Sequence, residues 1–146
     1  MTVTLRTLTT DDTEALGQVR QYFRNYAAWL GVDLSYQNFD QEMASLPGAY
    51  VAPQGRLFFA EVDGRPAGCV GVRPLPDSDG VCEMKRLYVE PAFRGTGVGR
   101  QLALLAPLVT SLTALSGFAL DDMTRDVGWR FLMLGRRIER LQFFAG

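Results

Sequence analysis

The sequence of 146 residues contains no histidine and only two cysteines, Cys69 and Cys82. Without histidine, a Ser-His or Cys-His catalytic pair cannot form. A Cys/His zinc site is excluded as well, because the two cysteines lack CxxC spacing and no histidine can complete a set of four ligands. We therefore predict no metal, and we expect two buried thiols in a reducing, cytoplasmic environment.

The chain also lacks a strong net charge and a long uninterrupted apolar run. Its formal net charge is −1, which gives no overall field to attract nucleic acid or an acidic membrane. The longest apolar stretch, Leu102–Leu120, contains Pro107, so we expect no membrane span. The end of the chain is basic, and Arg136-Arg137 there can contact phosphate or nucleic acid or lie on a solvated helix face. The acidic remainder of the chain argues against nucleic acid.

Apolar periodicity and turn residues predict one strand and two helices before a three-stranded meander. Val3–Leu8 alternates as a short strand. A helix follows a start that resembles a capping box at Asp11 and ends at Gly31, and a shorter helix covers about Phe39–Leu46. In the meander, Asp63-Gly64 predicts a tight turn. The three expected strands are Arg56–Val62, Ala67–Arg73 and Cys82–Val89.

A helical pattern replaces the strand pattern in the last third of the chain. From Gly97 onward, apolar residues recur at steps of three and four, which predicts a helix with a kink near Pro107. A second seam of the same spacing runs from Val127 to Phe144. We therefore divide the chain into an α/β (α+β) unit, residues 1–106, and a helical segment, residues 107–146.

The segment Glu83–Arg100 joins a strand to a helix through a glycine-rich turn. Gly95, Gly97 and Gly99 remove side chains where backbone N–H groups approach a ligand. A helix N-terminus adds unpaired N–H groups and a partial positive charge, so the segment can cradle a phosphate or diphosphate. A tight strand-to-helix connection that binds no ligand would show the same pattern of glycines.

The whole string is more specific, because it resembles motif A of the GNAT acetyltransferases. The signature of that motif, Arg/Gln-x-x-Gly-x-Gly/Ala, is matched by Arg94, Gly97 and Gly99. The stretch Arg86–Pro91 is similar to the fourth strand of the family, and the resemblance covers about Val3–Leu105. It implies acetyl-CoA as co-substrate and an amine as acceptor.

The resemblance also implies roles for individual residues. Leu87, Tyr88 and Val89 are expected to offer backbone groups to the pantetheine arm. Glu83 lies where some members of the family place a general base, and a partly buried carboxylate there suits proton removal from an ammonium; the alternative is a solvated or salt-bridged glutamate. The residues expected around the pyrophosphate are Arg94, Gly95, Thr96, Gly97, Val98, Gly99 and Arg100.

The later part of the chain departs from the family. GNAT proteins usually continue with further strands, and a tyrosine on a later helix often protonates the departing thiolate, whereas this chain has no tyrosine after Tyr88. Residues 108–143 instead resemble a fragment of the bacterial alpha-E helical proteins. We interpret the chain as a chimera, in which a truncated sheet of about four strands is followed by a helical hairpin. The open edge of strand Cys82–Val89 then needs a cover, either that hairpin or a second copy of the chain in a homo-oligomer.

Two functions follow from this organisation. The first is an acetyl-CoA-dependent N-acetyltransferase that acts on a small-molecule or peptide amine by direct transfer. The alternative is a degenerate module that binds coenzyme A weakly or not at all and serves in oligomerisation or partner binding. Phe23, Tyr26, Trp29 and Tyr36 are candidates to line an acceptor pocket, although their helical spacing is also typical of core residues.

Overall fold

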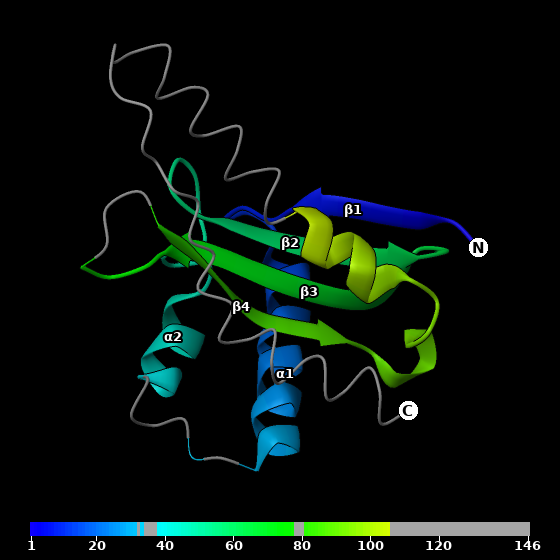
Figure 1. Cartoon of the computed structure of the whole chain (residues 1–146), viewed down its shortest axis with the longest axis horizontal. Helices are drawn as coiled ribbons and strands as arrows, with labels where there is room; N and C mark the ends of the chain where they lie inside the picture. The colour runs from blue at the N-terminus through cyan, green and yellow to red at the C-terminus, as the bar shows by residue number, and fades with distance from the viewer. Residues whose placement is uncertain (32, 34–37, 78–80, 106–146) are drawn as a thin grey trace.

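The centre of the molecule is an antiparallel sheet of four strands in the order β1-β2-β3-β4 (Figure 1). The computed structural model describes residues 1–31, 33, 38–77 and 81–105. The strands are β1 (Val3–Thr7), β2 (Arg56–Val62), β3 (Arg65–Pro74) and β4 (Cys82–Val89). The predicted α+β architecture with about four strands is therefore confirmed.

Helices cover both faces of the sheet. One hydrophobic cluster joins α1 (Thr13–Leu30) and α2 (Phe39–Ser45) to the first face. A second cluster joins η2 (Pro91–Phe93) and the helical residues 98–105 to the opposite face. In Figure 1 the yellow helix that follows β4 accordingly lies across the sheet from α1.

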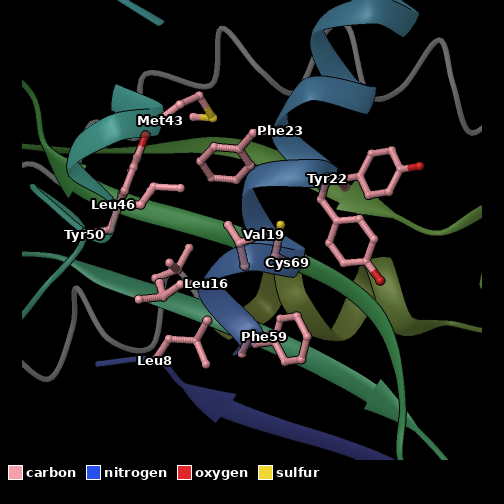
Figure 2. Packing of buried hydrophobic residues seen from close by; sticks show 13 residues of the cluster. Leu8, Leu16, Val19, Tyr22, Phe23, Met43, Leu46, Tyr50, Phe59 and Cys69 are labelled. Carbon is pink, nitrogen blue, oxygen red and sulfur yellow. The ribbon is translucent and has the colours of Figure 1, made fainter. Parts of the chain in front are cut away.

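Strand β2 shows why such a sheet needs apolar residues in consecutive positions. Leu57 and Phe59 belong to the cluster beneath α1, whereas Phe58 and Ala60 belong to the cluster on the other face. Each large side chain so buried stabilises the fold by about 1.5–3 kcal/mol. Figure 2 shows the α1 side, where Val19 of α1 lies beside the strands.

Most predicted boundaries agree with the structure to within a few residues. The predicted bounds of β2 and β4 are those observed, and β3 is longer at both ends. Gly31 ends α1 in the left-handed conformation, with a φ of 62°. The turn between β2 and β3 places both Asp63 and Gly64 at positive φ, as a two-residue hairpin requires.

The start of α1 differs from its prediction, and the placement of the cap at Asp11 is wrong. Asp12 is the N-cap residue, and its side chain makes no hydrogen bond to the helix. Its carboxylate instead accepts hydrogen bonds from the Thr9 N–H at 2.7 Å and from Arg6 Nη1 at 2.6 Å. Asp12 therefore ties the first turn back to β1 rather than closing a capping box.

The predicted helical hairpin of residues 107–146, the kink near Pro107 and the basic tail lie outside the described residues. Within the described ranges, no helix is long and apolar enough to cross a membrane.

A bulge interrupts β4. Where the register shifts, Val70 of β3 stands opposite two residues of β4, Arg86 and Leu87, and Arg86 has a φ of 59°. One extra residue reverses the side-chain alternation of a strand. Met84 before the bulge and Leu87 after it therefore pack against the same cluster, although three positions separate them.

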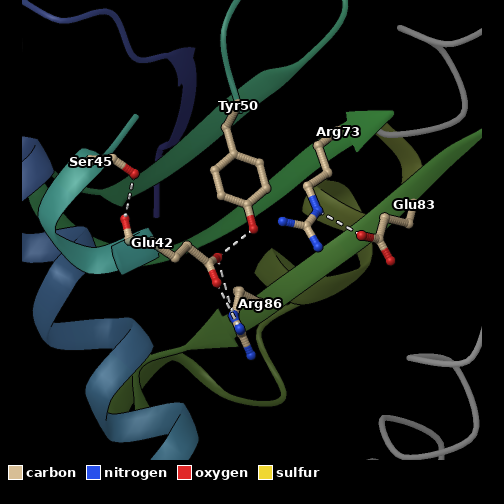
Figure 3. A network of polar contacts seen from close by, with 6 residues as sticks. All are labelled: Glu42, Ser45, Tyr50, Arg73, Glu83 and Arg86. Atoms are coloured by element: carbon tan, nitrogen blue, oxygen red, sulfur yellow. Dashed lines mark hydrogen bonds and ion pairs between the residues drawn. The ribbon is translucent and has the colours of Figure 1, made fainter. Parts of the chain in front are cut away.

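A buried charge network holds the bulge from α2 (Figure 3). Arg86 is only 4% exposed, and its Nη2 donates to Glu42 Oε2 at 2.8 Å and its Nε to Glu42 Oε1 at 3.3 Å. The Tyr50 hydroxyl donates to the same carboxylate. The Tyr50 ring also lies over Gly71, where an added Cβ would stand 2.6 Å from it. The residues that make the bulge are thus joined to α2 and to the neighbouring strand.

We expect Gly68→Ala to destabilise the protein by about 1–3 kcal/mol, because a Cβ at this position of β3 would lie 2.5 Å from the backbone oxygen of Tyr88. Gly17→Ala in α1 is the matched control, since a Cβ there meets nothing within 4 Å and alanine favours helix by about 1 kcal/mol. Urea unfolding measures both. A Gly68→Ala protein as stable as wild type would contradict the close approach of β3 and β4.

We also expect acid to remove the contribution of Glu42. Burial alone would raise the pKa of this carboxyl, but hydrogen bonds from Arg86 and Tyr50 lower it below the ordinary 4.5. A carboxyl whose pKa is lowered by folding stabilises the fold above its ordinary pKa and loses that contribution as pH falls through the lower folded value. Below pH 4.5, the melting temperature should fall more steeply for wild type than for Glu42→Gln. If the melting temperatures of the two proteins fell equally with pH, the network would not be charged.

Candidate functional site

The turn after η2 presents backbone without side chains. Gly95 has a φ of 77° and Gly97 a φ of 90°, a region that side-chain-bearing residues rarely adopt. A Cβ built on either glycine meets nothing within 4 Å. The surface beside these two residues is therefore open, and only glycine keeps it so in this conformation.

The helix that follows begins beside this turn, and its first N–H groups have no partner within the helix itself. Its first hydrogen bond runs from the Gln101 N–H to the Gly97 carbonyl at 3.0 Å. The N–H groups of the preceding turn thus lie ahead of the helical ladder, where a partial positive charge favours an anion. Val98 is 0% exposed, so only its backbone can face a ligand.

Gly99 has a packing role that differs from that of the other two glycines. A Cβ at this position would lie 3.2 Å from Val89 Cγ2. The helix thus sits close against β4 at residue 99, where a side chain would require Val89 to shift by a few tenths of an ångström. This contact fixes the direction of the helix N-terminus relative to the end of the strand.

The polar side chains of the turn are partly engaged within the turn itself. The Arg94 Nε donates to the Val89 carbonyl at 3.1 Å, and its guanidinium lies 5.9 Å from the Tyr88 ring centroid. The Thr96 hydroxyl donates to the Phe93 carbonyl at 2.6 Å. Arg94 is exposed nonetheless, so its positive charge stands beside the open turn.

Arg100 is exposed too, in the first turn of the helix. The structure therefore brings together the glycines, the helix N-terminus and the two arginines that the sequence predicted around a pyrophosphate. The turn fits such a group because it combines open space at two glycines, N–H donors and cationic side chains.

Strand β4 leads directly to this turn and is the last strand of the described sheet. The side chains of Leu87 and Val89 pack against the cluster on the helix 98–105 side, and Tyr88 packs beneath α1. What these three residues present at the edge of the described sheet is therefore backbone. An edge strand of this kind offers N–H and C=O groups to an extended ligand.

In the structure Glu83 forms a salt bridge, which is one of the two alternatives that the sequence left open for this residue. Arg73 Nε donates to Glu83 Oε1 at 2.6 Å, and the Glu83 side chain is 19% exposed. Lys85 lies on the same part of β4, and burial together with Arg73 and Arg86 lowers its pKa. Glu83 thus stands in a half-buried cluster of cations. A cationic amine acceptor would have to compete with Arg73 for the Glu83 carboxylate.

The aromatic residues of the first helix take different positions. Phe23 is buried in the core, and Tyr26 packs partly buried against the same cluster. Trp29 is 49% exposed, and Tyr36 lies outside the described residues. The core interpretation therefore holds for the first two, and the described part of the chain gives no acceptor pocket made by all four.

The sequence analysis missed the bulge and the Glu42–Arg86–Tyr50 network. A signal was present, because the apolar residues of β4 change from even to odd numbers between Met84 and Leu87. Such a change of parity within one strand indicates one inserted residue. The partners on α2 and the following loop had no sequence signal, since they come from a different part of the chain.

Solved structures resemble this fold at low sequence identity. An acetyltransferase of the GNAT family from Staphylococcus aureus matches with a TM-score of 0.59 at 13% identity, over 77% of this chain and 68% of that one. The PaiA N-acetyltransferase of Thermoplasma acidophilum, solved in complex with coenzyme A, matches with a TM-score of 0.57 at 17% identity, over 78% and 75%. These matches establish the fold.

Curated relatives are closer in sequence. The uncharacterised N-acetyltransferase YjgM of Escherichia coli is 34% identical over 104 residues, which is 70% of this chain and 61% of that protein. An uncharacterised N-acetyltransferase of Schizosaccharomyces pombe is 39% identical over 85 residues, 58% of this chain and 52% of that protein. The matches thus span less than two thirds of the length of these relatives.

Two family models match overlapping parts of the chain. The acetyltransferase (GNAT) family model matches residues 15–106. A model described as a predicted alpha-helical domain with a conserved ER motif, Alpha-E, matches residues 68–146, beginning earlier than the predicted residue 108. Its described part includes β3 from residue 68 onward and all of β4, and a Glu-Arg pair occurs at Glu139-Arg140. The chain belongs to the GNAT acetyltransferase family and, through residues 68–146, also to the Alpha-E family.

Proposed function

We propose that this chain is an acetyl-CoA-dependent N-acetyltransferase that transfers the acetyl group directly to an amine of a small molecule or peptide. The observation that carries the proposal is the open turn at Gly95 and Gly97, placed between the edge strand β4 and a helix N-terminus. Coenzyme A has a diphosphate for the turn and an extended amide-bearing arm for the strand edge. The names of the curated relatives, all N-acetyltransferases, support the reaction class.

In this proposal the parts of the coenzyme follow one another along the chain. With the pyrophosphate at the turn, the arm runs back along Val89, Tyr88 and Leu87. Three residues of strand span about 10 Å, which brings the thioester to the bulge at Arg86. A backbone N–H held in a fixed orientation at that point would stabilise the negative charge that develops on the thioester oxygen.

The chemical step needs few protein groups. The amine nitrogen attacks the thioester carbonyl carbon, the carbon–sulfur bond breaks, and the coenzyme leaves as a thiolate that takes a proton from water. The amine proton passes to Glu83 or to water. Positioning of the two reactants supplies most of the rate enhancement in such a reaction, so the lack of a tyrosine after Tyr88 is compatible with turnover.

The second candidate is a degenerate module that binds coenzyme A weakly or not at all. The absence of a tyrosine after Tyr88 and the limit of four strands in the described part of the sheet favour it. Titration calorimetry with acetyl-CoA, together with release of free thiol in the presence of a panel of amines, separates the two. Binding with turnover supports the enzyme, binding without turnover supports the module, and no binding at millimolar ligand rules out the enzyme.

A homo-oligomer assembled through residues 107–146 and a cytoplasmic location complete this proposal. The mass of the full chain in solution tests the assembly. A monomer would show that no second copy covers β4.

We expect Gly97→Ala to weaken acetyl-CoA binding by about tenfold or more, because a methyl group enters the space of the pyrophosphate and opposes a φ of 90°. Gly64→Ala is the matched control, with a φ of 74° and open space around its Cβ in the β2–β3 turn. It carries similar backbone strain far from the turn, so its affinity should equal that of wild type. Calorimetry measures both affinities. An equal loss of affinity in the two variants would contradict a pyrophosphate site at the turn of Gly95 and Gly97.

If Glu83 takes the amine proton, Glu83→Gln should lower kcat by about 100-fold or more, the usual contribution of a general base, with little change in the affinity for acetyl-CoA. Glu61→Gln is the matched control, since Glu61 is also a half-exposed strand glutamate paired with an arginine, Arg6 at 3.6 Å. Steady-state kinetics by thiol release measure the effect. An unchanged kcat would assign the proton to water and leave Glu83 a purely structural partner of Arg73.

A further inference from the structure

We propose that Glu42 is a positioning residue for acyl transfer, which acts from α2 through Arg86 to hold the bulge of β4 in the geometry that receives the thioester. This inference rests on the function proposed above. It assigns a role in the reaction to a carboxylate that no sequence motif of the chain marks.

The first argument is the conformation of Arg86. Its φ of 59° is left-handed, which costs a residue with a side chain about 1–2 kcal/mol. Glycine would adopt this conformation without strain. The position nevertheless carries the longest cationic side chain, buried to 4% exposure, so the side chain itself must offset the strain.

The second argument is the direction that the contacts impose. Arg86 reaches Glu42 through two nitrogens, Nη2 at 2.8 Å and Nε at 3.3 Å. A planar guanidinium bound through two nitrogens fixes an orientation as well as a distance. The Arg86 guanidinium also stands 5.1 Å from the ring centroid of Phe39, at the start of α2. The backbone of residue 86 is thereby held at a set rotation relative to α2.

The third argument is that a second contact reaches the opposite side of the bulge. Tyr50 donates to the Glu42 carboxylate, and its ring lies over Gly71 of β3. Gly71 pairs with Lys85, the residue of β4 just before the register shift. Glu42 therefore links both strands at the point where the ladder is interrupted.

Stability alone does not account for this arrangement. The side-chain exposures of the pair are 3% for Arg86 and 10% for Glu42, and a pair so buried contributes little more than apolar residues of the same shape. What an apolar contact cannot supply is directional control of a strained backbone. That control matters for the reaction. In the proposed binding mode the coenzyme arm runs from the glycine turn back along β4, and its thioester end reaches the bulge.

The first experiment needs no ligand. Amide hydrogen exchange is followed at Lys85, Arg86 and Leu87 in the full chain, for wild type, Tyr50→Phe and Glu42→Asp. Tyr50→Phe keeps the ring over Gly71 and removes one hydrogen bond to Glu42, and Glu42→Asp keeps the charge but shortens its reach. Both should exchange about tenfold faster at the bulge, whereas the amide of Glu90, bonded to the Ala67 carbonyl at 2.8 Å, should change little.

The control is Asp12→Asn, which breaks an ion pair of 2.6 Å with Arg6 at the start of α1 and should leave exchange at the bulge unchanged. Unchanged exchange at the bulge in Tyr50→Phe and Glu42→Asp would overturn the proposal, whatever the activity.

The second experiment separates kcat from binding. Glu42→Asp should lower kcat by about 10- to 100-fold, as expected for a misplacement near 1 Å, and Tyr50→Phe by less. The affinity for coenzyme A should stay within about threefold of wild type, because the turn at Gly95 and Gly97 is intact. An equal loss of affinity and kcat would overturn the proposal, since it would indicate general loosening of the fold.

The two experiments also separate this inference from the proposed function. If wild type neither binds coenzyme A nor turns over, the proposed function fails, and the positioning role for acyl transfer fails with it. If wild type is active and both variants keep its kcat, only the role of Glu42 fails.

Discussion

The extra residue in β4 is the constraint on which the rest of the site depends. By reversing the alternation of the strand, it places Leu87 and Val89 on the face that the following helix covers. Without it, these residues would face α1, and Tyr88 would leave the cluster that it shares with Tyr22. The bulge is strained at Arg86, and the side chain of this residue is bound by a buried carboxylate from α2.

The three glycines of the turn do different work, although they look alike in the sequence. Gly95 and Gly97 provide positive φ and open surface, whereas Gly99 lets the helix approach Val89. The first two shape what a ligand meets, and the third fixes where the helix N-terminus points. A phosphate site needs both, because N–H groups bind an anion only if they converge on it.

The sequence predicted most of this architecture because its signals are local. Alternation, turn residues and the glycine string each lie within about ten residues, so the strands β2 and β4 and the turn at Asp63-Gly64 agree with the structure. The failures involve partners distant in the chain. Asp12 rather than Asp11 is the N-cap residue of α1, and its carboxylate binds Arg6 of β1 instead of the helix. Likewise, no pattern within β4 pairs Glu83 with Arg73 or Arg86 with Glu42.

The cradle is built from backbone, and the groups that form it come from one short run of chain. From Leu87 to Gln101, the strand edge, the open turn and the first helical N–H groups follow one another without a break. The run packs against earlier elements of the chain, from β1, β2 and β3 on one face of the sheet to α1 and α2 on the other, and against Leu102 and Leu105 of its own helix. This run lies wholly within residues 68–106, which both family models match, so the two family likenesses share the groups that form the cradle.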